Sequence, residues 1–302
     1  MLLQKKSKSL PMYTVDAFVT EEGPFSGNPA GVCLIPYGMT IEVEKLQKIA
    51  LEMNLSETAF VQPLKEGDDC ATGKEFNLRW FTPTVEIPLC GHGTVASGYI
   101  ILNVLNNPNH EIEFHTMSGL LTAKRVEDSD EIAISLPTRD SVDVSDQPGF
   151  IQVAESAGIH INNEKVAIES IHYSSEAKKL FVHVKGGRSV LESIELNIPE
   201  MVACSVSVNS PLLSFVVTSE DDEYDFVLRV FCPWVGVNED PVTGSAQCPV
   251  ALYWSKVLGK TELVSRQCSP RGGVLRVKVN TDSNQVVISG NSVVFLEGKF
   301  YY

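Results

Sequence analysis

The chain contains two copies of one sequence pattern, and this repeat constrains its fold more than any other feature. The first copy, LRWFTPTVEIPLCGHGTVASG, begins at Leu78, and the second, LRVFCPWVGVNEDPVTGSAQCPVA, begins at Leu228. Further similar segments begin at His115 and Gln267, again about 150 residues apart, so both matches keep nearly the same spacing. This agreement indicates an internal duplication and predicts a chain that folds as two similar lobes.

A polar, turn-rich stretch from Pro137 predicts where the two lobes join. We predict an N-terminal lobe over residues 12–136 and a C-terminal lobe over residues 137–302, whose last strand is free to pack back on the first lobe. We expect the active-site cleft between the lobes. Residues 1–11 contain lysines but no apolar stretch of signal-peptide length, so we interpret them as a loose leader.

Composition and charge restrict the classes of function. Hydrophobic residues make up 43% of the 302 residues and charged residues 21%, as in ordinary soluble globular proteins. The net charge of −14 opposes binding to nucleic acid or to anionic membrane lipids, because such partners need clustered lysine and arginine. The seven cysteines include no CxxC pair, which favours a reducing compartment, and we predict a cytoplasmic protein.

A single acid in an apolar run is the first candidate for chemistry. Glu57 lies in the strand-like run Leu55–Val61, which follows a predicted amphipathic helix over residues 41–54. Burial of a carboxylate costs several kcal/mol unless it is paired or protonated, so a buried Glu57 would have a raised pKa and a chemical role. The alternative is a glutamate on a solvated strand edge.

Two small-residue segments precede runs that are apolar on every side. Residues 90–94 (CGHGT) precede the first run, and residues 240–246 (DPVTGSA) precede the second. Helices of this kind belong in a core, and their first N–H groups and positive dipole end suit a substrate carboxylate. We predict backbone donors at these two helix starts and Ser245 as the N-cap of the second helix.

The turn cluster GPFSGNPAG, residues 23–31, is a further candidate for ligand contact. Its backbone N–H groups suit an anion or a tight turn equally well, and a plain loop is an equal alternative. With the two helix starts, this cluster completes the predicted substrate-contacting residues, which are Asn28, Gly91, Gly93, Thr94, Thr243 and Gly244.

Glu57, His92, Asp240 and Ser245 are the predicted catalytic residues. Two acids and an imidazole near two helix starts suit removal and return of a proton on an acidic metabolite, a reaction that needs no cofactor. Structural alternatives remain, since His92 beside glycines fits a hydrogen-bonded structural role and Asp240 fits a helix cap.

Cys90 allows two interpretations. A thiol at a helix N-terminus is expected to have a lowered pKa and to be reactive, whereas a buried, inert cysteine is the commoner case. The other cysteines and the histidines show no ligand spacing, so we predict no metal site. The sequence has neither a full G-x-G-x-x-G segment nor a Walker loop, which argues against nucleotide binding.

From Met12 to its end, the sequence resembles the PhzF, or phenazine biosynthesis-like, family, and it closely resembles the animal members. The resemblance is carried by VDAF, FSGNPAGVC, EMNLSETAFV, LRWFTP, PLCGHGT, PWVGVNEDPVTGSA and QCSPRGG. It implies an α+β, diaminopimelate-epimerase-like fold, in which two pseudo-symmetric lobes each wrap a mixed, barrel-like sheet around a central buried helix. It also implies a homodimer.

Carried over by position, the resemblance implies that Glu57, in SETAF, is the general acid/base and that His92, Asp240 and Ser245 support it. Phenazine-producing members shift a proton within a dihydroxyanthranilate-type acid without a cofactor. Racemases and epimerases with the same fold use two facing cysteines instead, but residues 240–246 contain no thiol to face Cys90.

These observations predict a cofactor-independent isomerase that moves a proton on a small carboxylate-bearing metabolite. The main alternative is a binding or regulatory protein that keeps the cleft but has little turnover, and a cysteine-dependent racemase or epimerase is a further one. Fold similarity does not name the substrate.

Overall fold

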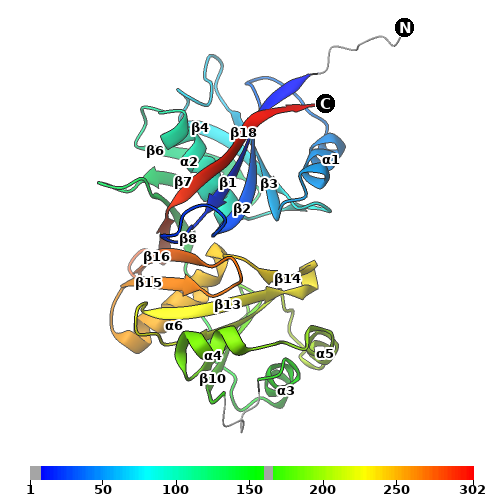
Figure 1. Cartoon of the computed structure of the whole chain (residues 1–302), viewed down its shortest axis with the longest axis vertical. Coiled ribbons are helices and arrows are strands. Elements are labelled where there is room, and N and C mark those ends of the chain that lie inside the picture. The colour runs from blue at the N-terminus through cyan, green and yellow to red at the C-terminus, as the bar shows by residue number, and fades with distance from the viewer. Residues whose placement is uncertain (1–7, 160–165) are drawn as a thin grey trace. The chain divides into compact units, whose positions relative to one another are not determined.

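The chain divides into two units (Figure 1). The computed structural model describes residues 8–159 and 166–302. Unit 1 contains the described residues up to Ser135 together with Ser289–Tyr302, and unit 2 contains Leu136–Ile288. The change of unit therefore falls close to the turn-rich stretch from Pro137, and the end of the chain returns to unit 1.

Unit 1 contains nine strands, two α-helices and a π-helical turn among the described residues. They are β1 (Ser9–Ala17), β2 (Asn28–Leu34), α1 (Val43–Met53), β3 (Glu57–Pro63), β4 (Glu75–Phe81), β5 (Glu86–Ile87), α2 (Gly91–Tyr99), η1 (Ile100–Val104), β6 (Glu111–Thr116), β7 (Gly119–Arg125), β8 (Ile132–Pro137) and β18 (Ser292–Tyr301).

The strands of unit 1 form one mixed sheet. Backbone pairing joins them in the order β18-β1-β2-β3-β4-β6-β7-β8, with β5 paired to the end of β4. The β2–β3 and β4–β6 pairs are parallel and the others are antiparallel. In Figure 1 the red β18 lies alongside the blue β1, as their pairing from Ser9–Tyr301 to Ala17–Ser292 requires.

Helix α2 is the centre of unit 1. It contacts β1, β2, β3, β7 and β18, and every residue from Gly91 to Gly98 is buried. Small residues allow this close approach: a Cβ on Gly93 would lie 2.9 Å from Trp80, and one on Gly98 would lie 3.0 Å from Ala123. The prediction of a buried helix after CGHGT is confirmed, and a substitution that adds volume at Gly98 would force the sheet apart.

Helix α1 covers the outer face of the same sheet. Its apolar stripe of Leu46, Ile49 and Ala50 packs in one cluster with Phe60 of β3 and Phe81 of β4. The helix ends at Asn54, whose left-handed backbone (φ 49°) makes it the predicted C-cap. The predicted amphipathic helix is thereby confirmed.

Unit 2 is built from the remaining elements. They are β9 (Val142–Asp143), α3 (Pro148–Ser156), β10 (Ile168–Ser174), β11 (Lys179–Val184), α4 (Gly187–Ser193), α5 (Ile198–Cys204), η2 (Ser205–Ser207), β12 (Ser214–Ser219), β13 (Phe226–Cys232), η3 (Pro233–Val235), β14 (Val237–Asp240), η4 (Gly244–Ala246), α6 (Gln247–Leu258), β15 (Glu262–Gln267), β16 (Gly273–Asn280) and β17 (Gln285–Gly290).

The sheet of unit 2 repeats the pairing pattern of unit 1. Its strands pair in the order β9-β10-β11-β12-β13-β15-β16, and β14 pairs with β13 as β5 does with β4. Again two pairs are parallel, β11–β12 and β13–β15, and they occupy the same places in the order as the parallel pairs of unit 1. The buried helix α6 contacts β15 and β16.

The structure corrects three local expectations, of which the first is a strand that the sequence of residues 201–208 predicts. Residues 201–208 alternate like a strand but form α5 and η2, because Asn197 caps the helix through the N–H of Glu200 and a proline occupies its first turn. Strand β1 begins at Ser9 rather than Met12, since Ser9 pairs with Tyr301. The prediction of a loose leader over residues 1–11 is therefore wrong for residues 9–11, and residues 1–7 lie outside the described residues. The predicted turn of residues 23–31 ends at Gly27, because strand β2 begins at Asn28.

Among the described residues, no helix combines the length and the apolar character needed to cross a membrane.

Candidate active site

Glu57 is placed by strand alternation. It is the first residue of β3 and pairs with Ala30 of the parallel strand β2. Phe60 faces α1, so Glu57, at odd spacing from it, points to the opposite face, where α2 packs. The side chain is only 15% exposed, which excludes the alternative of a solvated strand edge.

His92 is placed by the start of α2. It is the second residue of the helix, and its side chain is 6% exposed. The preceding Cys90 is the N-cap, with extended backbone, and its Sγ accepts a hydrogen bond from the Gly93 N–H at 3.3 Å. The hydroxyl of Thr94 donates to the Cys90 carbonyl at 2.6 Å. The helix start is thus fixed by its own short-range contacts.

The two side chains meet inside unit 1. Glu57 Oε2 lies 3.0 Å from His92 Nε2, which is the distance of an ion pair. The two groups are not aligned as a hydrogen bond, and Oε2 is buried with no hydrogen-bond donor among the described residues. A carboxylate oxygen held this way keeps a lone pair available for a proton from another group.

The charge of His92 is set by opposing effects. Burial lowers the pKa of its imidazole, and negative charge on Cys90 and Glu57 raises it, so that the pKa stands well above its usual value of 6.5. Burial also raises the pKa of the Cys90 thiol, to about 11, which keeps that thiol protonated near neutral pH. Glu57, with Oε2 3.0 Å from Nε2, is the other group whose negative charge raises the pKa of His92.

The same finding corrects one expectation for Cys90. The helix N-terminus was expected to lower the pKa of the thiol, but desolvation in a side chain that is 5% exposed outweighs it. Cys90 is a buried capping residue. All seven cysteines of the chain are free thiols.

In unit 2, Asp240 belongs to a network of fixed hydrogen bonds. The Thr243 hydroxyl donates to its carboxylate, and Gln267 Nε2 donates to its backbone carbonyl at 2.6 Å. Gln267 Oε1 in turn accepts from the Thr243 N–H at 2.8 Å. Asp240 therefore orders the loop before α6, but the alternative that it caps a helix is wrong, because the N-cap of η4 is Thr243 and that of α6 is Ala246.

Ser245 is not the N-cap that the sequence predicts. Residues 244–246 form the 3-10 turn η4, and α6 begins after it at Gln247. Pro249 lies in the first turn of α6, where the lack of an N–H is tolerated. Gly244 is buried and Ser245 is half-buried in this turn.

The other predicted contact residues are placed as follows. Asn28 is fully buried at the start of β2, opposite Ala17. The N–H of Gly93 and the hydroxyl of Thr94 already bond to Cys90, whereas Gly91 and His92 are the first two residues of α2, so their N–H groups have no partner within the helix. The sequence therefore located the helix start but did not distinguish its donors.

Two glutamines were missed by the sequence analysis. Gln267 bridges Asp240 and Thr243 and is the first residue of the QCSPRGG motif, so the motif held a usable signal. Gln247 is fully buried, and among the described residues its amide nitrogen and oxygen have no hydrogen-bond partner. Nothing in the sequence marks Gln247.

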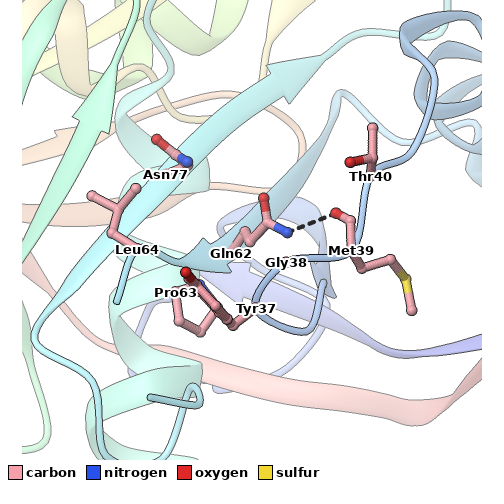
Figure 2. Close-up of a pocket in the computed structure, with 8 residues that line it drawn as sticks. All are labelled: Tyr37, Gly38, Met39, Thr40, Gln62, Pro63, Leu64 and Asn77. Atoms are coloured by element: carbon pink, nitrogen blue, oxygen red, sulfur yellow. Dashed lines mark hydrogen bonds between the residues drawn. The ribbon is translucent and has the colours of Figure 1, made fainter. Parts of the chain in front are cut away.

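A separate hollow of about 230 Å³ lies on the surface of unit 1 (Figure 2). Gln62 at its centre donates to the carbonyl of Met39 at 2.8 Å, as the dashed line shows. The lining contains none of the predicted site residues; it consists of Tyr37, Gly38, Met39, Thr40, Gln62, Pro63, Leu64 and Asn77.

Comparison with known proteins identifies relatives over almost the whole chain. The family model of the phenazine biosynthesis-like protein PhzC-PhzF matches residues 15–298. Phenazine biosynthesis-like domain-containing protein 1 of Mus musculus is 39% identical over 96% of this chain and 98% of its own length. An uncharacterized isomerase of Pseudomonas aeruginosa is 34% identical over 97% and 99%.

Solved structures agree with the fold. A PhzF family protein of Enterococcus faecalis, 31% identical, matches with a TM-score of 0.79 over 98% of this chain and 100% of that chain. A hydroxyproline epimerase of Agrobacterium vitis, only 10% identical, matches with a TM-score of 0.56 over 97% and 92%, which is a likeness of fold alone. The α+β, diaminopimelate-epimerase-like fold predicted from the sequence is confirmed.

Proposed function

Because the chain belongs to the phenazine biosynthesis-like (PhzC–PhzF) family, we propose that it is a cofactor-independent isomerase of a small carboxylate-bearing metabolite, with Glu57 as general acid/base. The observation that carries the proposal is the buried contact of 3.0 Å between Glu57 and His92 at the start of α2. The isomerase name of the bacterial relative supports the reaction class.

The proposed reaction moves one proton and no net electrons. Glu57 takes a proton from a substrate carbon, so that a C–H bond breaks, an O–H bond forms and the electron pair enters a new double bond. The same O–H then gives its proton to another substrate carbon as the double bond shifts. His92 holds the carboxylate from one side, and the N–H groups of Gly91 and His92 at the helix start are suited to a substrate carboxylate.

The predicted residues of unit 2 keep supporting roles in this proposal. Asp240, Thr243 and Gln267 form a prearranged network before α6, and Gly244 and Ser245 lie in the turn that follows. We assign Asp240 and Ser245 supporting roles, as their positions in the family motif imply. The matching strand pairings of the two units support an internal duplication as the origin of this arrangement.

The residues around Cys90 and Asp240 bear on the two alternative functions, a cysteine-dependent racemase and a binding protein. A cysteine-dependent racemase loses support, because residues 240–246 contain no thiol and burial raises the pKa of Cys90 to about 11. A binding protein with little turnover has no specific observation in its favour and is an outcome of the test below. A cytoplasmic homodimer is part of the proposal, supported by the family resemblance and by free cysteines.

The test measures uptake of deuterium from deuterated water by a panel of small carboxylic acids. We expect the wild-type protein to label at least one acid and Glu57→Gln to label the same acid about 10²–10⁴-fold more slowly. Glu113→Gln, which changes a surface strand glutamate near Lys74, is the matched control and should behave as the wild type. Equal labelling by wild type and Glu57→Gln would remove Glu57 from the mechanism, and no labelling of any acid would favour the binding role.

A further inference from the structure

We propose that Glu57, Cys90 and His92 also form a binding site for a thiophilic divalent cation, with Zn²⁺ as the best fit, and that the bound cation inhibits the isomerase. The metal site does not depend on the proposed function, whereas the inhibition does. The spacing of cysteines and histidines along the chain gives no sign of this site, because the three ligands combine β3 with the start of α2.

The distances between the three side chains suit a small cation. One ligand atom from each lies within 4.8 Å of the other two. Cys90 Sγ is 3.6 Å from His92 Nδ1 and 3.9 Å from Nε2, and Nε2 is 3.0 Å from Glu57 Oε2. Tetrahedral zinc with bonds of about 2.0–2.3 Å places neighbouring ligand atoms about 3.3–3.7 Å apart, so small side-chain shifts suffice.

The chemistry of the three ligands selects the cation. Thiolate and imidazole favour Zn²⁺ and similar metals, while Mg²⁺ and Ca²⁺ prefer oxygen ligands throughout. Three protein ligands leave a fourth position open for water or for a substrate carboxylate. Binding releases the thiol proton and any proton on the coordinating ring nitrogen to solvent, and it breaks no other bond.

Charge balance and rigidity favour the bound state. A thiolate, a carboxylate and a neutral imidazole together neutralise a divalent cation, which lowers the cost of burying the cluster. The Gly93 N–H already points at Cys90 Sγ and would stabilise the thiolate. Glu57 Oε2 is buried and has no hydrogen-bond donor among the described residues, so the cation displaces none there. A cation on Oε2 would occupy the lone pair that the general base needs.

The experiment titrates the full-length, metal-free protein with Co²⁺, which substitutes for Zn²⁺ and reports thiolate ligation by a charge-transfer absorption band. We expect one Co²⁺ per chain, the thiolate band, and displacement of Co²⁺ by Zn²⁺. Cys90→Ser should abolish the band. Loss of a group that only supports a metal ligand weakens metal binding about 10–100-fold, and Glu57→Gln, which removes a ligand, should weaken Co²⁺ binding by more than that. Cys248→Ser is the matched control, because Cys248 is another buried thiol near a helix start and burial raises its pKa to about 11 as well.

The outcomes separate the site from the function. Absence of the band in the wild type, or an unchanged band in Cys90→Ser, would overturn the metal site. Cys90→Ala, checked for native circular dichroism, covers the case in which the serine variant misfolds, and it must also lack the band. A thiolate band without labelling of any acid would leave the metal site standing and defeat the proposed function. Labelling that Zn²⁺ does not inhibit, at a concentration that displaces Co²⁺, would overturn the inhibition.

Discussion

The starts of the two buried helices, α2 in unit 1 and η4–α6 in unit 2, follow equivalent strands but carry different chemistry. Arg79 on β4 forms a two-bond ion pair with Glu86, and Arg229 on β13 forms the same pair with Glu239. Each arginine also lies over a phenylalanine two residues further along, at 5.2 Å and 5.0 Å from the ring centre.

On this shared frame the functional groups differ. Unit 1 places a carboxylate against an imidazole, with an oxygen that no described donor occupies. In unit 2 the Asp240 carboxylate accepts a hydrogen bond from the Thr243 hydroxyl, and the Asp240 backbone carbonyl accepts one from Gln267 Nε2. We propose that the helix start of unit 1 carries the proton-transfer group and that the helix start of unit 2 carries binding groups, and the predictions below test that division.

The largest expected effect separates the two helix starts by kinetics. His92→Gln removes the imidazole that contacts Glu57, and we expect the rate of the labelling reaction to fall about 10²–10⁴-fold. Thr243→Val removes a hydroxyl from the unit 2 network, and we expect mainly a weaker apparent affinity with a rate within about tenfold of wild type. Steady-state labelling rates at varied acid concentration measure both. A larger rate loss in Thr243→Val than in His92→Gln would reverse the assignment.

The next effect compares the two arginine pairs by stability. Arg229 is 13% exposed and also donates to the carbonyls of Leu191 and Ile194, so Arg229→Met should cost about 3–5 kcal/mol of unfolding free energy. Arg79 is 35% exposed and lacks such carbonyl contacts among the described residues, so Arg79→Met should cost about 1–2 kcal/mol.

Urea unfolding of both arginine variants measures this difference. Lys278→Met, which breaks an exposed pair with Glu262, is the control and should change stability by less than about 0.5 kcal/mol. Equal losses from the two arginine variants would mean that burial does not distinguish the pairs.

A smaller effect concerns Gln247 at the first position of α6. In the repeat, Val95 of α2 occupies the corresponding place, whereas Gln247 buries an amide with no partner among the described residues. Gln247→Met keeps the volume and removes the polar atoms, so we expect a gain of about 1 kcal/mol in unfolding free energy. Loss of acid labelling together with this gain would indicate that the amide binds substrate. A loss of stability would show that the amide is satisfied in solution.

The smallest effect is the pH dependence that His172 gives to unit 2. Burial lowers the pKa of the His172 imidazole below 6.5, and the nearby His183 lowers it further, whereas Asp143 acts in the opposite direction. Tyr253 packs against the His172 ring. The folded state then binds fewer protons than the unfolded state, so this contribution is complete above pH 6.5 and is lost as the pH falls toward the folded-state pKa. His172→Gln should flatten the decrease in melting temperature below pH 6.5. If the melting temperature of His172→Gln falls below pH 6.5 as steeply as that of the wild type, other groups cause the decrease.

Patterns within one element were readable from the sequence, and contacts between elements mostly were not. The spacing of apolar residues predicted α1, and the all-apolar run after CGHGT predicted the buried α2. Alternation misled at residues 201–208, where capping by Asn197 gives a helix instead. An acid in an apolar run and a histidine at a helix start made Glu57 and His92 candidates, but their contact depends on how β3 packs against α2.

The chemistry of Cys90 shows why local rules were insufficient. A helix N-terminus alone predicts a lowered thiol pKa, and only the surrounding packing, with Trp80 against Gly93, shows that desolvation decides the outcome. For the same reason the metal-ligating set could not be read from spacing, since Glu57 comes from a different strand.

Chemical rescue of Glu57→Ala tests the central claim most directly. The truncated side chain leaves room beside His92 for a small carboxylate such as formate or acetate. We predict that Glu57→Ala labels no acid on its own and that added formate or acetate restores labelling in proportion to its concentration, with no such effect on the wild type. Labelling by Glu57→Ala at the wild-type rate, without any added carboxylate, would contradict the assignment of Glu57 as the group that moves the proton.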